Sequence, residues 1–142
     1  MFKAETRYAL HTVTLLAQAE GLTSTASLAE RMELSSAMAA KVLHQLALAG
    51  LVQGRPGPGG GYRLARPAGA ITLMEVVAVG EGPDWGMHCL LGLPQCDDAH
   101  PCALHRSWGA MRDRIRQMLE HYTVADLAAG EVDLDADPGA RA

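Results

Sequence analysis

Three cysteines and a histidine lie close together in the second half of the chain. They are Cys89, Cys96, Cys102 and His105, in the pattern C-x6-C-x5-C-x2-H. Thiolate sulfur and imidazole nitrogen are ligands of zinc and of iron–sulfur clusters, and four such donors are enough for either. Glycine and proline residues between the cysteines favour an irregular loop that can wrap around a metal.

This pattern has several interpretations. Three buried free thiols are disfavoured because the neighbours Asp97, Asp98 and His100 are polar. Zinc sites usually contain tight C-x2–4-C pairs, so the wider gaps favour an iron–sulfur cluster, with zinc as the alternative. A catalytic Cys–His pair would need an orienting third group and a substrate pocket, and the sequence identifies neither. We therefore do not expect an enzyme.

A long helix is predicted directly after the cysteines. Apolar residues from Leu104 to Tyr122 recur at steps of 4, 3, 4, 3 and 4, which is a heptad stripe. If the helix begins near Cys102, then Cys102 and His105 share one face. Such a stripe can pack against its own domain, but we favour pairing of two subunits, because the chain is small and also has the helix-turn-helix pattern described next. The predicted dimer-interface residues are Trp108, Met111, Ile115, Met118 and Tyr122.

The first half of the chain has the pattern of a winged helix-turn-helix. A helix is expected over residues 5–20, a short helix after a capping box at Ser27 and Glu30, and a longer one from the Ser35 cap to Gly50. Two short strands then flank a Gly/Pro turn at residues 54–61, which we interpret as a wing, although a flexible linker would share this composition. The predicted fold class is mainly α, with a long C-terminal dimerisation helix.

Charge is distributed unevenly along the 142 residues. The net charge of −4 argues against a nucleic-acid partner at face value. However, residues 1–66 contain seven Lys or Arg and four Asp or Glu, whereas the remainder contains five and twelve. The first part is therefore basic, as a DNA-binding region requires.

Composition also predicts the organisation and location of the chain. We expect a DNA-binding region at 1–67, a metal-binding loop and dimerisation helix at 68–128, and an acidic, disordered tail at 129–142. An odd cysteine count excludes a closed disulfide framework. The sequence has no apolar run long enough for a membrane helix and no apolar signal core, so we expect a cytoplasmic protein with no membrane partner.

Three features together resemble a known family. They are Arg7-Tyr8-Ala9-Leu10, the glycine-rich wing at residues 55–64, and the three-cysteine loop before a long helix. This combination is similar to the bacterial winged-helix regulators that include the iron–sulfur cluster regulator IscR and the nitric-oxide-sensitive repressor NsrR. The resemblance implies a homodimeric transcription factor whose cysteine loop holds an iron–sulfur cluster.

The resemblance also implies a ligand set. In the cluster-assembly regulators a histidine three residues after the last cysteine completes the site, and His105 has that position here. In some nitric-oxide sensors an aspartate ligand precedes the N-terminal aromatic residue, but Arg7 stands there in this chain. A 2Fe–2S cluster is thus favoured over 4Fe–4S. The first cysteine gap is one residue longer than in the cluster-assembly regulators, and His88 and His100 are alternative ligands.

A winged helix-turn-helix also predicts which residues meet double-stranded DNA. The second helix would face the major groove or its phosphates, and the wing would contact the backbone or minor groove. A two-fold dimer would bind a roughly palindromic operator. The predicted contacts are Ser36, Ala37, Ala40, Lys41 and His44 on the helix, and Arg55, Gly59, Gly60 and Arg63 on the wing.

The function predicted from these features is a transcriptional repressor. Its operator affinity would be controlled by an iron–sulfur cluster that responds to iron–sulfur status, redox conditions or nitric oxide. The first alternative is a zinc- or thiol-based regulator without a cluster. A small iron–sulfur electron-transfer protein ranks lower, because it would need neither the basic half nor the helix-turn-helix.

Overall fold

A computed structural model describes residues 2–130. Most of this part of the chain is helical, with one two-stranded antiparallel sheet, which confirms the predicted winged helix-turn-helix. Residues 131–142, which make up most of the predicted acidic tail, lie outside the described range. The elements are α1 (Ala4–Gln18), α2 (Thr25–Arg31), α3 (Ser36–Leu48), β1 (Val52–Arg55), β2 (Gly61–Leu64), η1 (Ala68–Ala70), α4 (Leu73–Glu81), α5 (His105–His121) and α6 (Val124–Ala129).

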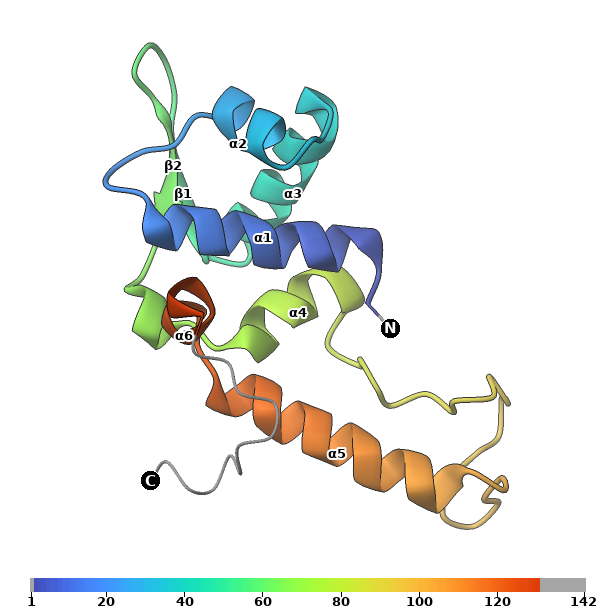
Figure 1. Cartoon of the computed structure of the whole chain (residues 1–142). Helices are drawn as coiled ribbons and strands as arrows, with labels where there is room; N and C mark the ends of the chain where they lie inside the picture. The colour runs from blue at the N-terminus through green and yellow to red at the C-terminus, as the bar shows by residue number, and fades with distance from the viewer. Residues whose placement is uncertain (1, 131–142) are drawn as a thin grey trace.

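The elements form three levels in Figure 1. The helix-turn-helix α2–α3 and the β1–β2 hairpin lie at one end, α1 and α4 lie in the middle, and α5 crosses the opposite end. The apolar core joins these levels. Its fully buried members include Val13 and Leu46 from the first part of the chain, and Ile71 and Val76 from the second. The core is therefore continuous across the predicted boundary at residue 67.

Local signals fix the helix-turn-helix. The Ser35 hydroxyl accepts the Met38 N–H at 3.1 Å and caps α3 as predicted. The predicted start of α2 is wrong: the N-cap is Ser24, whose hydroxyl accepts the Ser27 N–H, so Ser27 lies inside the helix. The helix begins earlier because Thr23 pairs with the wing, and the chain is free to turn immediately after that pairing.

The wing is held against the body by this same pairing. Thr23 and Tyr62 exchange two backbone hydrogen bonds of 2.9 and 2.8 Å. Gly61 is required next to them, because its φ is +150° and a Cβ there would lie 2.4 Å from the Thr23 carbonyl oxygen. The strands are in register from Val52 opposite Leu64 to Arg55 opposite Gly61.

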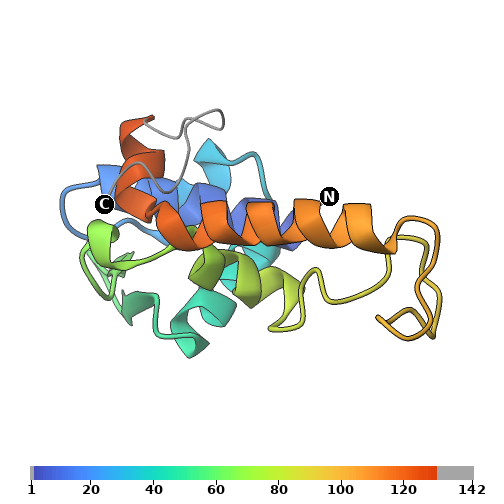
Figure 2. The same ribbon diagram turned by 90° about the horizontal axis from the view of Figure 1, so that it is seen from below.

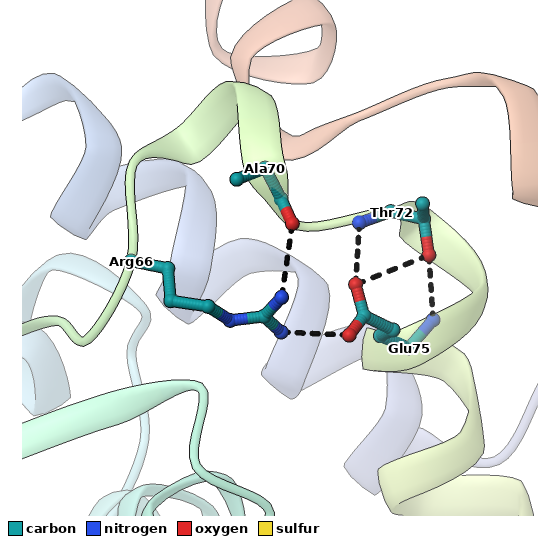
Figure 3. Close-up of polar contacts among 4 residues, drawn as sticks. All are labelled: Arg66, Ala70, Thr72 and Glu75. Atoms are coloured by element: carbon teal, nitrogen blue, oxygen red, sulfur yellow. Dashed lines mark hydrogen bonds and ion pairs between the residues drawn. The ribbon is translucent and has the colours of Figure 1, made fainter.

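The end of the wing is tied to the start of α4 (Figure 3). Arg66 donates to the Ala70 carbonyl at 3.0 Å and to Glu75 Oε1 at 2.6 Å. Oε2 of Glu75 accepts the Thr72 N–H at 2.9 Å, which completes a capping box. Partial burial raises the pKa of Glu75, but hydrogen bonds from Arg66 and Thr72 outweigh it and lower the pKa overall.

The end of α5 is tied to the same turn of α4. An antiparallel bridge joins Thr72 to Thr123, where Leu73 N–H donates to the Tyr122 carbonyl and Val124 N–H donates to the Ile71 carbonyl, both at 2.9 Å. The wing and α5, which lie at opposite levels of the molecule, are therefore anchored on the first turn of α4.

Two predictions about α5 are corrected by the structure. The helix begins at His105, so Cys102 lies in the preceding loop and does not share a helical face with His105. Tyr122 follows the helix in extended conformation and is 1% exposed, because it turns into the protein's own core. It is therefore unavailable to a partner subunit. Within residues 2–130, no helix is both long and apolar enough to cross a membrane.

Candidate functional site

The structure brings the three cysteine side chains together. Their Sγ atoms all lie within 4.8 Å of one another, and the Cys89 and Cys102 sulfurs are 3.8 Å apart. Residues 83–104, which carry the thiols, contain no helix or strand. This loop and the free end of α5 project beyond the rest of the molecule in Figure 2. A pocket of about 400 Å³ opens beside the sulfurs, between the loop and the first turns of α5.

His105 joins this group from the first position of α5. Its Nδ1 lies 3.1 Å from the Cys96 Sγ, and its Nε2 lies 3.0 Å from Oδ1 of Asp98. His105 N–H donates to the Cys102 carbonyl, which fixes the last cysteine relative to the helix. A histidine ligand characteristically has its second ring nitrogen held by a carboxylate or carbonyl. The observed arrangement provides such a carboxylate.

The alternative histidines are placed differently. His100 is exposed, and its Nδ1 faces Asp97 Oδ1 at 3.3 Å. His88 lines the pocket, and its carbonyl accepts the indole N–H of Trp108 at 3.1 Å. Among the residues that the structure describes, the histidine in contact with a cysteine sulfur is His105.

The loop makes the three thiols unequal. Backbone hydrogen bonds from Leu93 and Leu91, opposed by some desolvation, lower the pKa of Cys89 to about 7 from its usual 9.0. A backbone hydrogen bond from Cys102 favours the thiolate of Cys96, but burial and the neighbouring sulfurs outweigh it and raise the pKa of Cys96. Cys89 is thus a ready thiolate donor near neutral pH, and thiolate is the form that binds metal.

The segment that leads from the end of α4 into the cysteine loop is held by contacts to α1, to the residues before α1 and to α5. Arg116 on α5 donates to the Trp85 carbonyl at 3.1 Å, and the Trp85 ring packs on Phe2 with centroids 5.4 Å apart. Glu81 at the end of α4 accepts the Lys3 N–H at 2.6 Å and the Thr6 hydroxyl at 2.7 Å. The loop therefore leaves the body from an anchored segment, and its cysteine-bearing part lies further out.

The predicted DNA contacts lie at the other end of the molecule. Ser36, Ala37, Ala40, Lys41 and His44 are all exposed and share one face of α3. Arg55, Gly59 and Arg63 are exposed on the wing, and Gly60 is partly covered. Figure 1 shows α3 and the hairpin at the same end of the molecule. Lys41 is engaged in part by Glu5 of α1, with Nζ and Oε1 3.5 Å apart.

Sequence reasoning missed three groups at these two sites. Asp98 was noted as a polar neighbour, but its position against His105 depends on how the loop folds back, for which the sequence carries no signal. Ser24 and Thr25 line a hollow of about 480 Å³ with Arg55 beside the wing. The sequence does offer Ser24 as an N-cap residue for α2, but the capping-box pattern of Ser27 and Glu30 was chosen instead.

The predicted dimer seam on α5 is divided. Met111 is 60% exposed and Leu104 40% exposed, whereas Ile115 and Met118 pack partly against the protein's own core. Trp108 is half-buried and lines the pocket beside the cysteines. The exposed part of the stripe is thus the half nearest the cysteine loop.

Comparisons with known proteins agree on one family. Residues 2–130 match Rrf2, described as an iron-dependent transcriptional regulator. A putative HTH-type transcriptional regulator of Aquifex aeolicus (strain VF5) is 29% identical over 131 residues, which cover 89% of this chain and 90% of that protein. The HTH-type transcriptional regulator IscR of Enterobacter sp. (strain 638) is 33% identical over 111 residues, or 78% of this chain and 67% of that one.

Solved structures give the same result. CymR (YrzC), the global cysteine regulator of B. subtilis, superposes with a TM-score of 0.77 at 30% identity, covering 92% of this chain and 97% of that chain. IscR of T. potens superposes with a TM-score of 0.73 at 26% identity, covering 96% and 92%. Both superpositions therefore cover nearly the whole chain and not the winged helix alone.

Proposed function

The chain belongs to the Rrf2 family of transcriptional regulators, and on that premise we propose that it is a repressor whose operator affinity is controlled by an iron–sulfur cluster. As a member of this family it is a DNA-binding regulator and not an enzyme. We assign DNA binding to residues 1–67 and cluster binding and dimerisation to 68–128. We place the protein in the cytoplasm, where bacterial DNA lies.

The convergence of the donor atoms carries this proposal. Three sulfurs lie within 4.8 Å of one another, and the Cys96–His105 contact adds a nitrogen whose ring is oriented by Asp98. This donor set fits an iron–sulfur cluster held by Cys89, Cys96, Cys102 and His105. Nitrogen ligation is known on 2Fe–2S centres, so we favour 2Fe–2S over 4Fe–4S. A bound cluster would supply a redox-active centre sensitive to iron supply, oxidants and nitric oxide.

The residues around the site have separate tasks. Cys89, Cys96 and Cys102 would hold the site from the loop, and His105 would hold it from the first position of α5. Asp98 Oδ1, 3.0 Å from Nε2 of His105, would favour the tautomer protonated at Nε2, which leaves Nδ1 directed at the site. Ligation would therefore join the projecting loop to the first turn of α5, and a change in the ligands would alter how that helix end is held.

Anaerobic purification tests the cluster directly. We expect a coloured protein with equimolar iron and acid-labile sulfide, and we expect the colour to be lost in His105→Ala. His100→Ala is the matched control, because His100 faces Asp97 and should retain the colour. Colourless protein with stoichiometric zinc would contradict the cluster proposal and would support a zinc site instead.

A thiol-based regulator remains the second candidate, and one observation favours it. CymR, a global cysteine regulator, has the same architecture with a TM-score of 0.77. Under this alternative the cysteines would bind no metal and would respond to thiol chemistry alone. Metal-free protein that binds operator DNA and loses affinity on thiol modification would support it over the cluster.

The DNA surface is expected to read a roughly palindromic operator as a homodimer. The exposed half of the α5 stripe, with Met111 at its centre, would be covered by the second copy, and Trp108, Ile115 and Met118 would continue the interface. Met111→Asp should shift the protein to monomer in light-scattering measurements. A dimer that persists in this variant would contradict the assigned interface.

Salt titration of operator binding tests the α3 assignment. Each phosphate contact contributes about −0.9 to the slope of log affinity against log salt concentration. Lys41→Ala should therefore weaken binding and reduce that slope by about one. Lys3→Ala makes the same charge change outside α3 and the wing, and should leave the slope unchanged. Equal slopes in all three proteins would overturn the assignment.

A further inference from the structure

Two contacts stand out among the four donor atoms, although the Cys96 sulfur also lies within 4.8 Å of the other two sulfurs. The sulfurs of Cys89 and Cys102 face each other at 3.8 Å, and the Cys96 sulfur faces Nδ1 of His105 at 3.1 Å. A disulfide requires an S–S distance of about 2.0 Å, so the first pair needs an approach of roughly 2 Å. We expect rotation of the two side chains to supply this approach. All three thiols are free and half-buried, and so are accessible to small oxidants.

We propose that the metal-free chain contains a specific oxidation site, in which Cys89 and Cys102 form an intramolecular disulfide while Cys96 stays reduced. The oxidant class is a hydroperoxide. One thiolate attacks the O–O bond and becomes a sulfenic acid, and the departing oxygen leaves as water after protonation. The second thiolate then attacks that sulfur, the S–S bond forms and a second water leaves. Two thiols and one hydrogen peroxide give one disulfide and two waters.

Cys96 is excluded from the bond by its own partner. Its sulfur is engaged by His105, and the imidazole is held from the opposite side by Asp98 at 3.0 Å. Joining Cys96 to either of the other thiols would break this chain of contacts. Joining Cys89 to Cys102 leaves it intact, and the main chain of Cys102 is already held by the N–H of His105.

An unfolded chain would favour a different disulfide from the one proposed here. Cys89 and Cys102 are 13 residues apart, whereas Cys89 and Cys96 are 7 apart and Cys96 and Cys102 are 6 apart. In an unfolded chain shorter loops close more readily, so the Cys89–Cys102 bond would be the least favoured of the three. A dominant Cys89–Cys102 bond would therefore report the folded geometry.

The consequence for regulation rests on the proposed function. The disulfide removes two of the four donors, so the oxidised chain should take up no cluster until a reductant reopens the bond. The disulfide itself concerns the metal-free chain and does not depend on which metal or cluster the site holds.

Peptide mapping tests the bond. Metal-free full-length protein is treated with hydrogen peroxide, blocked with an alkylating agent and cut before aspartate. The cuts at Asp84, Asp97, Asp98 and Asp113 place Cys89 and Cys96 on the 84–96 peptide and Cys102 on the 98–112 peptide. We expect the two peptides to be linked, with the alkyl group on Cys96. The group on Cys89, or unlinked peptides with an internal 89–96 bond, would overturn the proposal.

Variants and a denatured control make the result specific. Cys96→Ser should form the linked peptides at a rate within about twofold of the native chain, whereas Cys89→Ser and Cys102→Ser should lose them by about tenfold or more. In guanidinium the shorter loops should dominate instead. The same pairing ratio in folded and denatured protein would contradict a role for the folded site.

Reconstitution separates this inference from the proposed function. Reduced protein that takes up a cluster, and oxidised protein that does so only after reductant is added, is the expected result. Equal uptake by both, without reductant, would overturn the inference alone. If neither form takes up a cluster while the 89–102 bond still maps, the cluster proposal fails and the oxidation site stands.

Discussion

The two ends of the molecule to which we assign DNA binding and metal binding are built by different means. At the DNA-binding end, α2, α3 and the wing are joined to the buried core, to a backbone bridge and to side-chain caps. At the metal-binding end, residues 83–104 have no helix or strand, and Met87, Leu90, Leu91 and Leu93 expose large apolar side chains. The first end has a shape of its own, whereas the second presents donor atoms and apolar side chains that a ligand and a second subunit could complete.

The largest expected effect compares a leucine from each end. Leu46→Ala opens a cavity in the core beneath α3, where the side chain is fully buried, and should lower the free energy of unfolding by about 2–5 kcal/mol. Leu91→Ala in the metal-free chain removes an exposed side chain and should change it by about 0.5 kcal/mol or less. Urea unfolding measures both. A cost for Leu91→Ala near that for Leu46→Ala would mean that the loop has a core of its own.

The wing provides the next test. Gly61→Ala places a Cβ against the Thr23 backbone and should cost about 2 kcal/mol or more, with loss of operator binding, because the wing can no longer dock. Gly59→Ala is the matched control: its φ is also positive, at +72°, but no atom lies within 4 Å of the added Cβ. That substitution should cost about 1 kcal/mol from the backbone alone. Equal costs would show that the bridge to Thr23 does not hold the wing.

At the metal-binding end we expect a smaller effect from the carboxylate behind His105. Asp98→Asn should weaken cobalt(II) binding about tenfold, the lower part of the range for such supporting groups, since the Asp98 side chain is fully exposed. Cobalt(II) absorption, titrated against a competing chelator, gives the affinity. Asp97→Asn, which changes the partner of His100, should leave it unaltered. The reverse ranking would favour His100 as the ligand.

The smallest effect concerns the junction between the two ends. The pKa of Glu75 is lowered in the folded chain, so its carboxylate stabilises the fold above its unfolded pKa of about 4.5 and loses this contribution as the pH falls through the lower folded value. Glu75→Gln should therefore be about 1 kcal/mol less stable at pH 7, and the difference should vanish in acid. Thermal unfolding from pH 3 to 7 measures this dependence. A difference that is constant with pH would contradict a charged role for Glu75.

The sequence predicted the DNA-binding end well, because its signals are local. Ser35 and Gly50 each act within one turn of α3, and the structure confirms both roles. Ser24 was missed because its selection as a cap depends on the pairing of Thr23 with Tyr62, which are distant in the sequence. The correct residues were present, but the choice between Ser24 and Ser27 was made by a tertiary contact.

The metal-binding end shows the opposite limit. Cys89, Cys96, Cys102 and His105 were identified by residue type and spacing, yet their partners were not. Asp98 reaches His105 only because the loop folds back, and Tyr122 continued the heptad pattern in sequence although the helix ends at His121. Periodicity cannot show where a helix stops, and a loop without regular structure carries no period at all.

The wing and α5 are both anchored on the first turn of α4, so a movement of α5 could be passed to the wing through that turn. With 17 residues α5 is about 25 Å long. The C-terminal half of α5 is held by the Thr72–Thr123 bridge and by packing of Ile115 and Met118 on the core, whereas the cysteine loop lies at the other end of the helix. The Arg66–Glu75 contact lies close to the bridge. If α5 is rigid, a displacement of about 3 Å at the cysteine end would tilt the helix by only about 7°. A large displacement of the cysteine loop would therefore reach Arg66, at the end of the wing, only as a small rotation.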